Sequence, residues 1–383
     1  MKQILIKVYR PTGDLIKVWD KATFQGFTKE LNGGLGSCTI ELGEKFDYSG
    51  EDLKLNNDVE IIVSDKDTVG TSEGYKVIYK GYISKYILWS QSNKEKIEVN
   101  LLGYYTKLAQ DIWKDGTTVT FDNIGSAKDI GTQFRELMDR YIAETSNPKL
   151  SYNSDTIKTT GTTTEYKFEK LTYRQGIDIL KSLAPANWFW YVGESGMVYF
   201  KSKPTTATHK FILGRHFSGI VVERSMEKIK NAVLFYSDNL SPALLKLYTD
   251  PTSVQGYGRR ITQTADNRVG VITDADKIAE SYVAEHKDPD IRVTAEIIDN
   301  NESDLGYDIE SINPGDTCTF YGFDESLADI FKENMLITRV DYSLNKATIT
   351  IEPLKAGIIK RTEDISGRVG SIEGEGVPTV YTT

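Results

Sequence analysis

The residue types that most often carry chemistry are sparse in this sequence and do not form a recognisable catalytic pattern. The three histidines, His209, His216 and His286, lack metal-site spacing and have no cysteine or carboxylate pair nearby. The segment Gly193-Glu194-Ser195-Gly196 contains a serine, but it lacks the spacing of a nucleophile elbow and falls in an expected hairpin turn. Among 55 acidic residues a glycosidase pair stays open, although nothing in the sequence selects one. We therefore predict no catalytic, metal or cofactor residues and no enzymatic activity.

The cysteines, glycine runs and charge exclude further classes of site. Cys38 and Cys318 are far apart and have no partner motif, which argues against a disulfide framework or a zinc site and favours two buried free thiols. Gly33-Gly34-Leu35-Gly36 and 367–376 are not followed by Gly-Lys, so both are interpreted as turns rather than phosphate loops. A net charge of −9, with Arg259-Arg260 as the densest basic spot, argues against specific nucleic-acid binding.

The aromatic run Asn187-Trp188-Phe189-Trp190-Tyr191-Val192 could either bind a glycan or pack in a core. Stacked tryptophan and tyrosine faces hold sugar rings, which supports the first interpretation. In an extended strand, however, Trp188 and Trp190 share one face while Phe189 and Tyr191 share the other. This arrangement suits a hairpin that is covered on both faces by the first two helices of the chain. We favour core packing and keep glycan or protein contact as the alternative.

Length and composition define the elements that must position any site. The chain has 383 residues and a mass of 43.1 kDa, which predicts two or three cores. Its 22 Tyr, 14 Phe and 5 Trp lie among many β-branched residues, which favours strands over helices. No apolar run approaches the roughly 20 residues of a membrane span, and the first residues do not form a signal peptide. We expect a folded protein that is made in the cytosol.

Alternation of apolar and polar residues predicts about six strands in the first hundred residues, which would form an antiparallel barrel or sandwich. The expected strands are 4–9, 15–19, 37–42, 58–63, 75–88 and 97–102. Three one-sided helices are predicted near 126–145, 172–184 and 273–287, the second opening with the capping box Thr172-x-x-Gln175.

A weak internal repeat links the two ends of the chain. The order Asn57-Asp58-Val59, polar loop, Gly81-Tyr82-Ile83-Ser84, turn, Lys96-Ile97-Glu98-Val99 returns near the end of the chain. There it reads Pro314-Gly315-Asp316-Thr317, loop, Met335-Leu336-Ile337-Thr338, turn, then 347–352. The match lies in order and turn placement, and it predicts two copies of one β-domain.

The order of several segments together resembles the tail hub proteins of bacteriophages and related injection machines. This family includes the myophage baseplate hub and the N-terminal structural module of siphophage tail-associated lysins. The resemblance spans about Met1 to Pro353 and rests on the following segments: 37–42, 81–83, 101–108, 171–183, 188–192, 196–200, 231–233, a helix that ends before Pro289, 312–316, and the hairpin of 337–342 with 347–352.

The resemblance implies an α+β, β-rich fold with two similar antiparallel β-barrel domains joined by smaller α/β domains. We expect the following division of the chain: a first barrel at 1–105, an α/β domain with the aromatic hairpin at 106–215, a second barrel at 216–238 plus 290–355, an inserted segment at 239–289, and a Gly-rich C-terminal tail at 356–383.

By the same resemblance, the protein is a structural homotrimer at the distal end of a phage tail, in a virion assembled in the host. Its ring would adapt the sixfold tail tube or distal tail protein to a threefold tip, and would enclose a channel for the tape measure protein and DNA. A separate tip, spike or fibre protein would follow it. The expected partner-contact loops contain Asp65, Lys66, Asp67, Thr68, Asp324 and Glu325. The alternative function is a peptidoglycan- or glycan-acting or glycan-binding protein of the tail tip.

Overall fold

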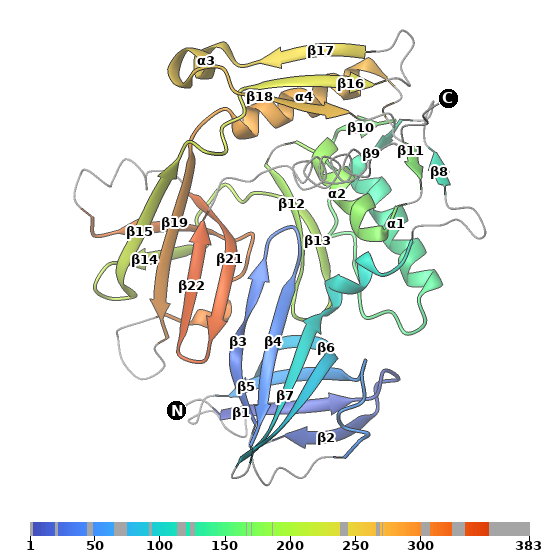
Figure 1. The fold of residues 1–383 in the computed structure, drawn as a ribbon, viewed down its shortest axis with the longest axis vertical. Coiled ribbons are helices and arrows are strands. Elements are labelled where there is room, and N and C mark those ends of the chain that lie inside the picture. Colours follow the sequence, from blue (N-terminus) through green and yellow to red (C-terminus); the bar gives the residue numbers. More distant parts are fainter. Residues whose placement is uncertain are drawn as a thin grey trace, which may run out of the picture.

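The computed structural model describes residues 3–19, 22–43, 49–64, 75–91, 94–112, 120–122, 127–165, 167–169, 171–185, 187–237, 244–265, 269, 271–299, 307–323 and 334–351. Strands dominate this part of the chain, and helices gather on one side of it (Figure 1). The predicted β-rich α+β class is therefore confirmed. No helix of the described residues is long and apolar enough to cross a bilayer.

The largest element is a sheet of 13 described strands, in the order β15-β19-β22-β21-β3-β4-β7-β6-β5-β1-β2, with β20 also pairing with β21 and β14 with β20. The strands of the N-terminal part are β1 (Gln3–Tyr9), β2 (Leu15–Trp19), β3 (Thr23–Glu30), β4 (Leu35–Leu42), β5 (Asp58–Ser64), β6 (Tyr75–Gln91) and β7 (Lys94–Gly103). Those of the later part are β14 (His209–Ile212), β15 (Phe217–Ser225), β19 (Asp290–Ile298), β20 (Thr317–Tyr321), β21 (Met335–Ser343) and β22 (Lys346–Ile351).

Two sets of five strands within this sheet have the same pairing order. The first unit is β3 to β7, paired as β5-β6-β7-β4-β3, and the second unit is β15 with β19 to β22, paired as β20-β21-β22-β19-β15. Every one of these pairings is antiparallel. The strands also follow one another along the chain in the same order in both units. The repeat predicted from the sequence is therefore present in the strand topology.

The two units also agree residue by residue at their hairpins. The register between β6 and β7 shifts after Ile83, and that between β21 and β22 shifts after Ile337. Counting from these bulges, Glu41 and Lys96 of the first unit correspond to Glu296 and Lys346 of the second unit. Each of these pairs forms an ion pair of 2.7 Å.

The backbone before the first hairpin strand repeats as well. Asn56 N–H donates to the Ile83 carbonyl and Gly315 N–H donates to the Ile337 carbonyl, each over 2.8 Å. Asn56 and Gly315 both have positive φ, at 71° and 90°. A position that needs this conformation favours glycine or asparagine, which are the residues found there.

The two units are joined directly through strand pairing. β3 of the first unit lies antiparallel to β21 of the second, with Phe27 opposite Tyr342 and Glu30 opposite Arg339. One apolar core runs through both units, and the stacked rings of Phe27 and Tyr342, 5.1 Å apart, lie at their boundary. The β-sheets in the lower half of Figure 1 are therefore a single connected structure.

A second core lies among the helices and the aromatic hairpin. The helices are α1 (Ile130–Glu144), α2 (Tyr173–Leu183), α3 (Pro251–Tyr257) and α4 (Ile272–His286), with the 3-10 turns η3 (Tyr104–Ala109) and η4 (Ile309–Ser311). The hairpin is β12 (Trp188–Val192) with β13 (Val198–Ser202), and β16 (Ala232–Ser237), β17 (Leu244–Thr249) and β18 (Ile261–Ala265) form a separate sheet over α4. Two short pairs complete the lobe, β8 (Thr120–Asp122) with β11 (Lys167–Glu169) and β9 (Lys128–Asp129) with β10 (Thr163–Thr164).

The starts of α1 and α2 follow their capping residues. The predicted capping box is confirmed, because Thr172 accepts from Gln175 N–H and the Gln175 side chain accepts from Thr172 N–H. The first helix begins at Ile130, later than predicted, because Asp129 provides its N-cap by accepting from Thr132 N–H. The third predicted helix is α4, and the short helix α3 was not predicted.

Two strands lie outside the domain boundaries expected for them. Residues 232–237 were placed in the second barrel, but they form β16 in the inserted sheet. Residues 209–212 were placed in the α/β domain, but they form β14, which pairs with β20 of the second unit. Both segments have the apolar character of strands, and sequence does not say which sheet such a strand joins. The division into two barrels with smaller domains remains a proposal.

Candidate functional site: the junction of the lobes

The histidines occupy structural positions. His209 lies between the Tyr307 hydroxyl (2.9 Å) and the Asp316 carboxylate (3.1 Å). The Nδ1 atom of His216 accepts from Ile212 N–H over 3.2 Å, and burial, with the neighbouring Arg215, lowers the pKa of His216. His286 Nδ1 lies 2.8 Å from the carbonyl of Tyr282, one turn earlier in α4. Within the described residues, no three His, Cys, Asp or Glu side chains are placed to hold a metal ion.

The six residues proposed for partner contact, Asp65, Lys66, Asp67, Thr68, Asp324 and Glu325, lie outside the described residues, as does the tail at 356–383. Their positions in the chain are nevertheless informative. The first four lie between β5 and β6, and the other two lie between β20 and β21. These two connections are equivalent in the repeated units.

The aromatic hairpin is a packed element. Trp188, Phe189 and Trp190 are only 8%, 0% and 0% exposed, so they offer no open ring face to a sugar. Trp188 and Trp190 point into the helical core, as predicted. The helices cover only this face, however, and the expectation of helices on both faces was wrong. Gly315 of the second unit lies against the opposite face at Phe189, so close that an added Cβ would come within 2.5 Å of the ring.

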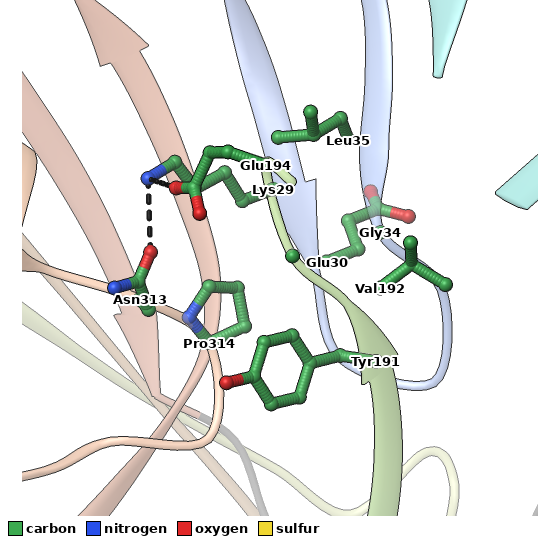
Figure 2. A pocket seen from close by; sticks show the side chains of 10 residues that line it. Lys29, Glu30, Gly34, Leu35, Tyr191, Val192, Glu194, Asn313 and Pro314 are labelled. Atoms are coloured by element: carbon green, nitrogen blue, oxygen red, sulfur yellow. Dashed lines mark hydrogen bonds and ion pairs between the residues drawn. The ribbon is translucent and has the colours of Figure 1, made fainter. Parts of the chain in front are cut away.

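Lys29 connects the first unit, the aromatic hairpin and the segment that leads into the second unit. It projects from β3, its side chain is only 5% exposed, and its ammonium group pairs with Glu194 in the turn of the aromatic hairpin. The same Nζ donates to Asn313 Oδ1 over 2.9 Å, in the segment that leads to β20 (Figure 2). A buried ammonium that lost either partner would remain poorly solvated, so this contact holds the three segments in one arrangement.

A second set of contacts fixes the hairpin to the turn between β3 and β4. Asn32 N–H donates to the Trp190 carbonyl over 2.7 Å. Arg174 of α2 donates to the Asn32 carbonyl over 3.0 Å, and its guanidinium lies 5.2 Å from the ring centroids of both Tyr105 and Trp190. Asp178, one turn later in α2, accepts from the Trp190 indole N–H over 3.2 Å. These contacts fix the hairpin to α2 and to the turn between β3 and β4.

The hollow at this junction is small. It is lined by residues of β3, β4, the hairpin and the Asn313-Pro314 segment, and has room for about one water molecule (Figure 2). Tyr191 and Lys29 face it from opposite sides (Figure 2). A drug-sized ligand needs a cleft of roughly 300 Å³ or more, so this hollow is too small for one and is a packing gap between the hairpin and the two units. Sequence reasoning missed Lys29, because no feature of its local sequence distinguishes it from an exposed lysine.

Comparison with known proteins identifies the fold. No protein-family model matches the sequence, and no curated protein is similar to it. The 43 kDa tail protein of prophage MuSo2 from Shewanella oneidensis has a similar structure, with a TM-score of 0.62, 15% identity, and coverage of 93% of this chain and 99% of that one. The tail protein from Neisseria meningitidis gives a TM-score of 0.59 at 10% identity, over 92% and 96% of the two chains. Prophage tail protein gp18 from Listeria monocytogenes gives 0.55 at 13% identity, over 95% and 98%.

The chain thus has the fold of phage tail proteins, along almost its whole length and almost the whole length of each of these relatives. The resemblance noted in the sequence is confirmed at this level. All three of these proteins are named as tail proteins.

Proposed function

We propose that the protein is a homotrimeric hub at the distal end of a phage tail and acts without catalysis. The observation that carries this proposal is the repeated five-strand unit within one chain. Three chains with two units each present six similar units around a threefold axis, which matches the symmetry of a sixfold tube. The parts that are not repeated, among them the helical lobe and the inserted sheet, keep threefold symmetry and suit a threefold tip.

The proposed ring encloses a channel for the tape measure protein and, later, for DNA. Three chains of net charge −9 give −27, and we propose that part of this negative charge lines the channel, so that it does not bind DNA tightly. We assign contact with the tube or distal tail protein to the connections between β5 and β6 and between β20 and β21, because these connections occupy equivalent places in the two units of each chain. A separate tip, spike or fibre protein docks on the threefold face.

The mass of the protein in solution tests the proposal. Light scattering over a range of concentrations should give about 129 kDa, three times the chain mass of 43.1 kDa. Negative-stain images should then show rings with six similar densities on one face. A strict monomer, both alone and with tail tube or distal tail protein, would overturn the hub. A turbidity assay on host cell walls tests the alternative of a glycan-acting protein, for which the buried aromatic hairpin gives no support.

A further inference from the structure

Within one chain, the two units are joined by one strand pair, β3 with β21, and the equivalent pair between the described strands β15 and β6 is not formed. Within the chain, β21 pairs along one edge with β22, while its other edge pairs first with β20 and then, from Arg339 to Tyr342, with β3. In the first unit, β6 is the equivalent of β21. One edge pairs with β7, and the other pairs with β5 only up to Tyr82. Among the described strands, none lies beside residues 84–91 on that edge.

The second unit has the matching open edge. β15 is the equivalent of β3, and it pairs with β19 at the end of the 13-stranded sheet. No described strand pairs with its outer edge, and Val221 on β15 is 66% exposed. The chain therefore carries both halves of a second contact of the β3–β21 type, and the two halves belong to different units.

Equivalent residues of β21 and β6 differ in exposure, because only β21 has a partner strand from the other unit. Val340 and Tyr342 of β21 are 0% and 2% exposed. Their equivalents in β6, counted from the shared bulge, are Tyr86 and Leu88, which are 41% and 58% exposed. Part of the difference has a clear origin, because Tyr342 stacks on Phe27 of β3. Apolar side chains that are buried where the contact is made and exposed at the equivalent positions where its partner strand is missing indicate a protein interface.

We propose that β15 of one copy pairs antiparallel with residues 85–88 of β6 in the next copy, as β3 pairs with β21 within each chain. The partner is a second copy of this chain, because its own repeat supplies the complementary edge. This inference rests on the trimeric ring of the proposed function and states how the ring closes. Such a head-to-tail contact closes into a ring when the rotation per copy is one third of a turn.

The repeat also specifies the register. In the first unit, Phe27 of β3 lies opposite Cys38 of β4, which lies opposite Leu101 of β7. In the second unit, Val222 of β15 lies opposite Val293 of β19, which lies opposite Ile351 of β22. Leu101 and Ile351 are equivalent, so Phe27 and Val222 are equivalent as well. Tyr342 lies opposite Phe27, so Leu88 of one copy lies opposite Val222 of the next.

One residue along the strands, Ile87 then lies opposite Glu223, and Lys85 is diagonal to Glu223 on the same face. Opposite charges in diagonal positions stabilise a strand pair. The equivalents of Ile87 and Glu223 within the chain are Asp341 and Thr28, whose side chains are hydrogen-bonded over 2.8 Å. Two cysteines at Ile87 and Glu223 would therefore be close enough to form a disulfide between copies.

Crosslinking tests the register directly. The double variant Ile87→Cys/Glu223→Cys should give covalent dimers and trimers on non-reducing gels, no larger species, and single chains after reduction. The matched control is Ile87→Cys/Arg224→Cys, in which the second cysteine is shifted by one residue and faces the other side of the strand. The native cysteines, Cys38 and Cys318, are buried and give no background. Crosslinking of the control as strongly as the double variant, or ladders beyond three chains, would overturn the proposed contact.

A surface variant separates this contact from trimer formation in general. Leu88→Asp should shift the solution mass from about 129 kDa to 43.1 kDa with an unchanged circular dichroism spectrum, because Leu88 is 58% exposed in the single chain. Leu245→Asp on β17, where the leucine is 67% exposed, is the control and should stay trimeric. If the wild type is a trimer, Leu88→Asp is also a trimer, and Ile87→Cys/Glu223→Cys gives no crosslinked chains, the proposed hub stands and this contact is wrong. If the wild type is a monomer even with tail partners, both proposals fail.

Discussion

Replacing Gly315 by alanine should destabilise the junction of the lobes more than a change at any open glycine. Gly315 has a φ of 90°, a conformation that costs an L-residue about 1–2 kcal/mol. The new Cβ would also lie 2.5 Å and 2.8 Å from Cε2 and Cζ of Phe189, well inside contact distance. Phe189 is fully buried, so its ring cannot move aside cheaply, and such overpacking costs about 1–3 kcal/mol. We expect a total loss of about 3 kcal/mol in unfolding free energy.

Gly13→Ala is the matched control for this change. Gly13 has a φ of 102°, but nothing lies within 4 Å of the added Cβ, so it measures the backbone cost alone. Urea unfolding followed by tryptophan fluorescence should separate the two variants by about 2 kcal/mol, the share that comes from the clash. Combining Gly315→Ala with Phe189→Leu should recover part of that difference, because the smaller side chain frees the space. Equal losses for Gly315→Ala and Gly13→Ala would refute the close packing of the hairpin on the second unit.

Three further measurements test other parts of the fold. Lys29→Met should lower the unfolding free energy by about 3 kcal/mol, since it leaves a carboxylate without its buried partner, and a neutral result in urea unfolding would contradict the buried ion pair. Burial, with a hydrogen bond to Asp139, raises the pKa of Tyr152 from 10.0 to about 12. The neutral Tyr152 hydroxyl therefore contributes fully to the unfolding free energy below pH 10, and this contribution is lost as the pH rises towards 12. Tyr152→Phe should remove this dependence of the unfolding free energy on pH. Burial also raises the pKa of the Cys38 and Cys318 thiols, so both should resist a thiol reagent in the native protein and react in urea; rapid native labelling would disprove their burial.

The sequence predicted the elements with strong local signals. The capping box at Thr172 located α2, and the aromatic run of β12 was correctly expected to pack in a core, although helices cover only one of its two faces. The repeat was found because its turns and apolar runs recur in order. The matched segments at Ile83 and Ile337 are equivalent in the structure.

Other elements depend on contacts between distant residues, which local pattern does not encode. β3 was not predicted, because Gly26 interrupts its alternation, and yet this strand joins the two units. The position of β16 depends on pairing with β17 and β18 rather than on its own residues. Lys29 was not assigned to any strand, and its role follows only from the approach of Glu194 and Asn313.

The segment inserted between β15 and β19 makes the two units form at different times during synthesis. The first unit is contiguous, since β3 to β7 occupy residues 23–103 and can pair as soon as they leave the ribosome. The second unit is interrupted between β15 and β19 by the three-stranded sheet with α3 and α4. β15 can therefore pair with β19 only after about 65 more residues have been made, and the second unit is complete only when β22 has been made. The open edge of β6 is thus formed well before that of β15, so a nascent chain would display one half of the contact proposed above without the other.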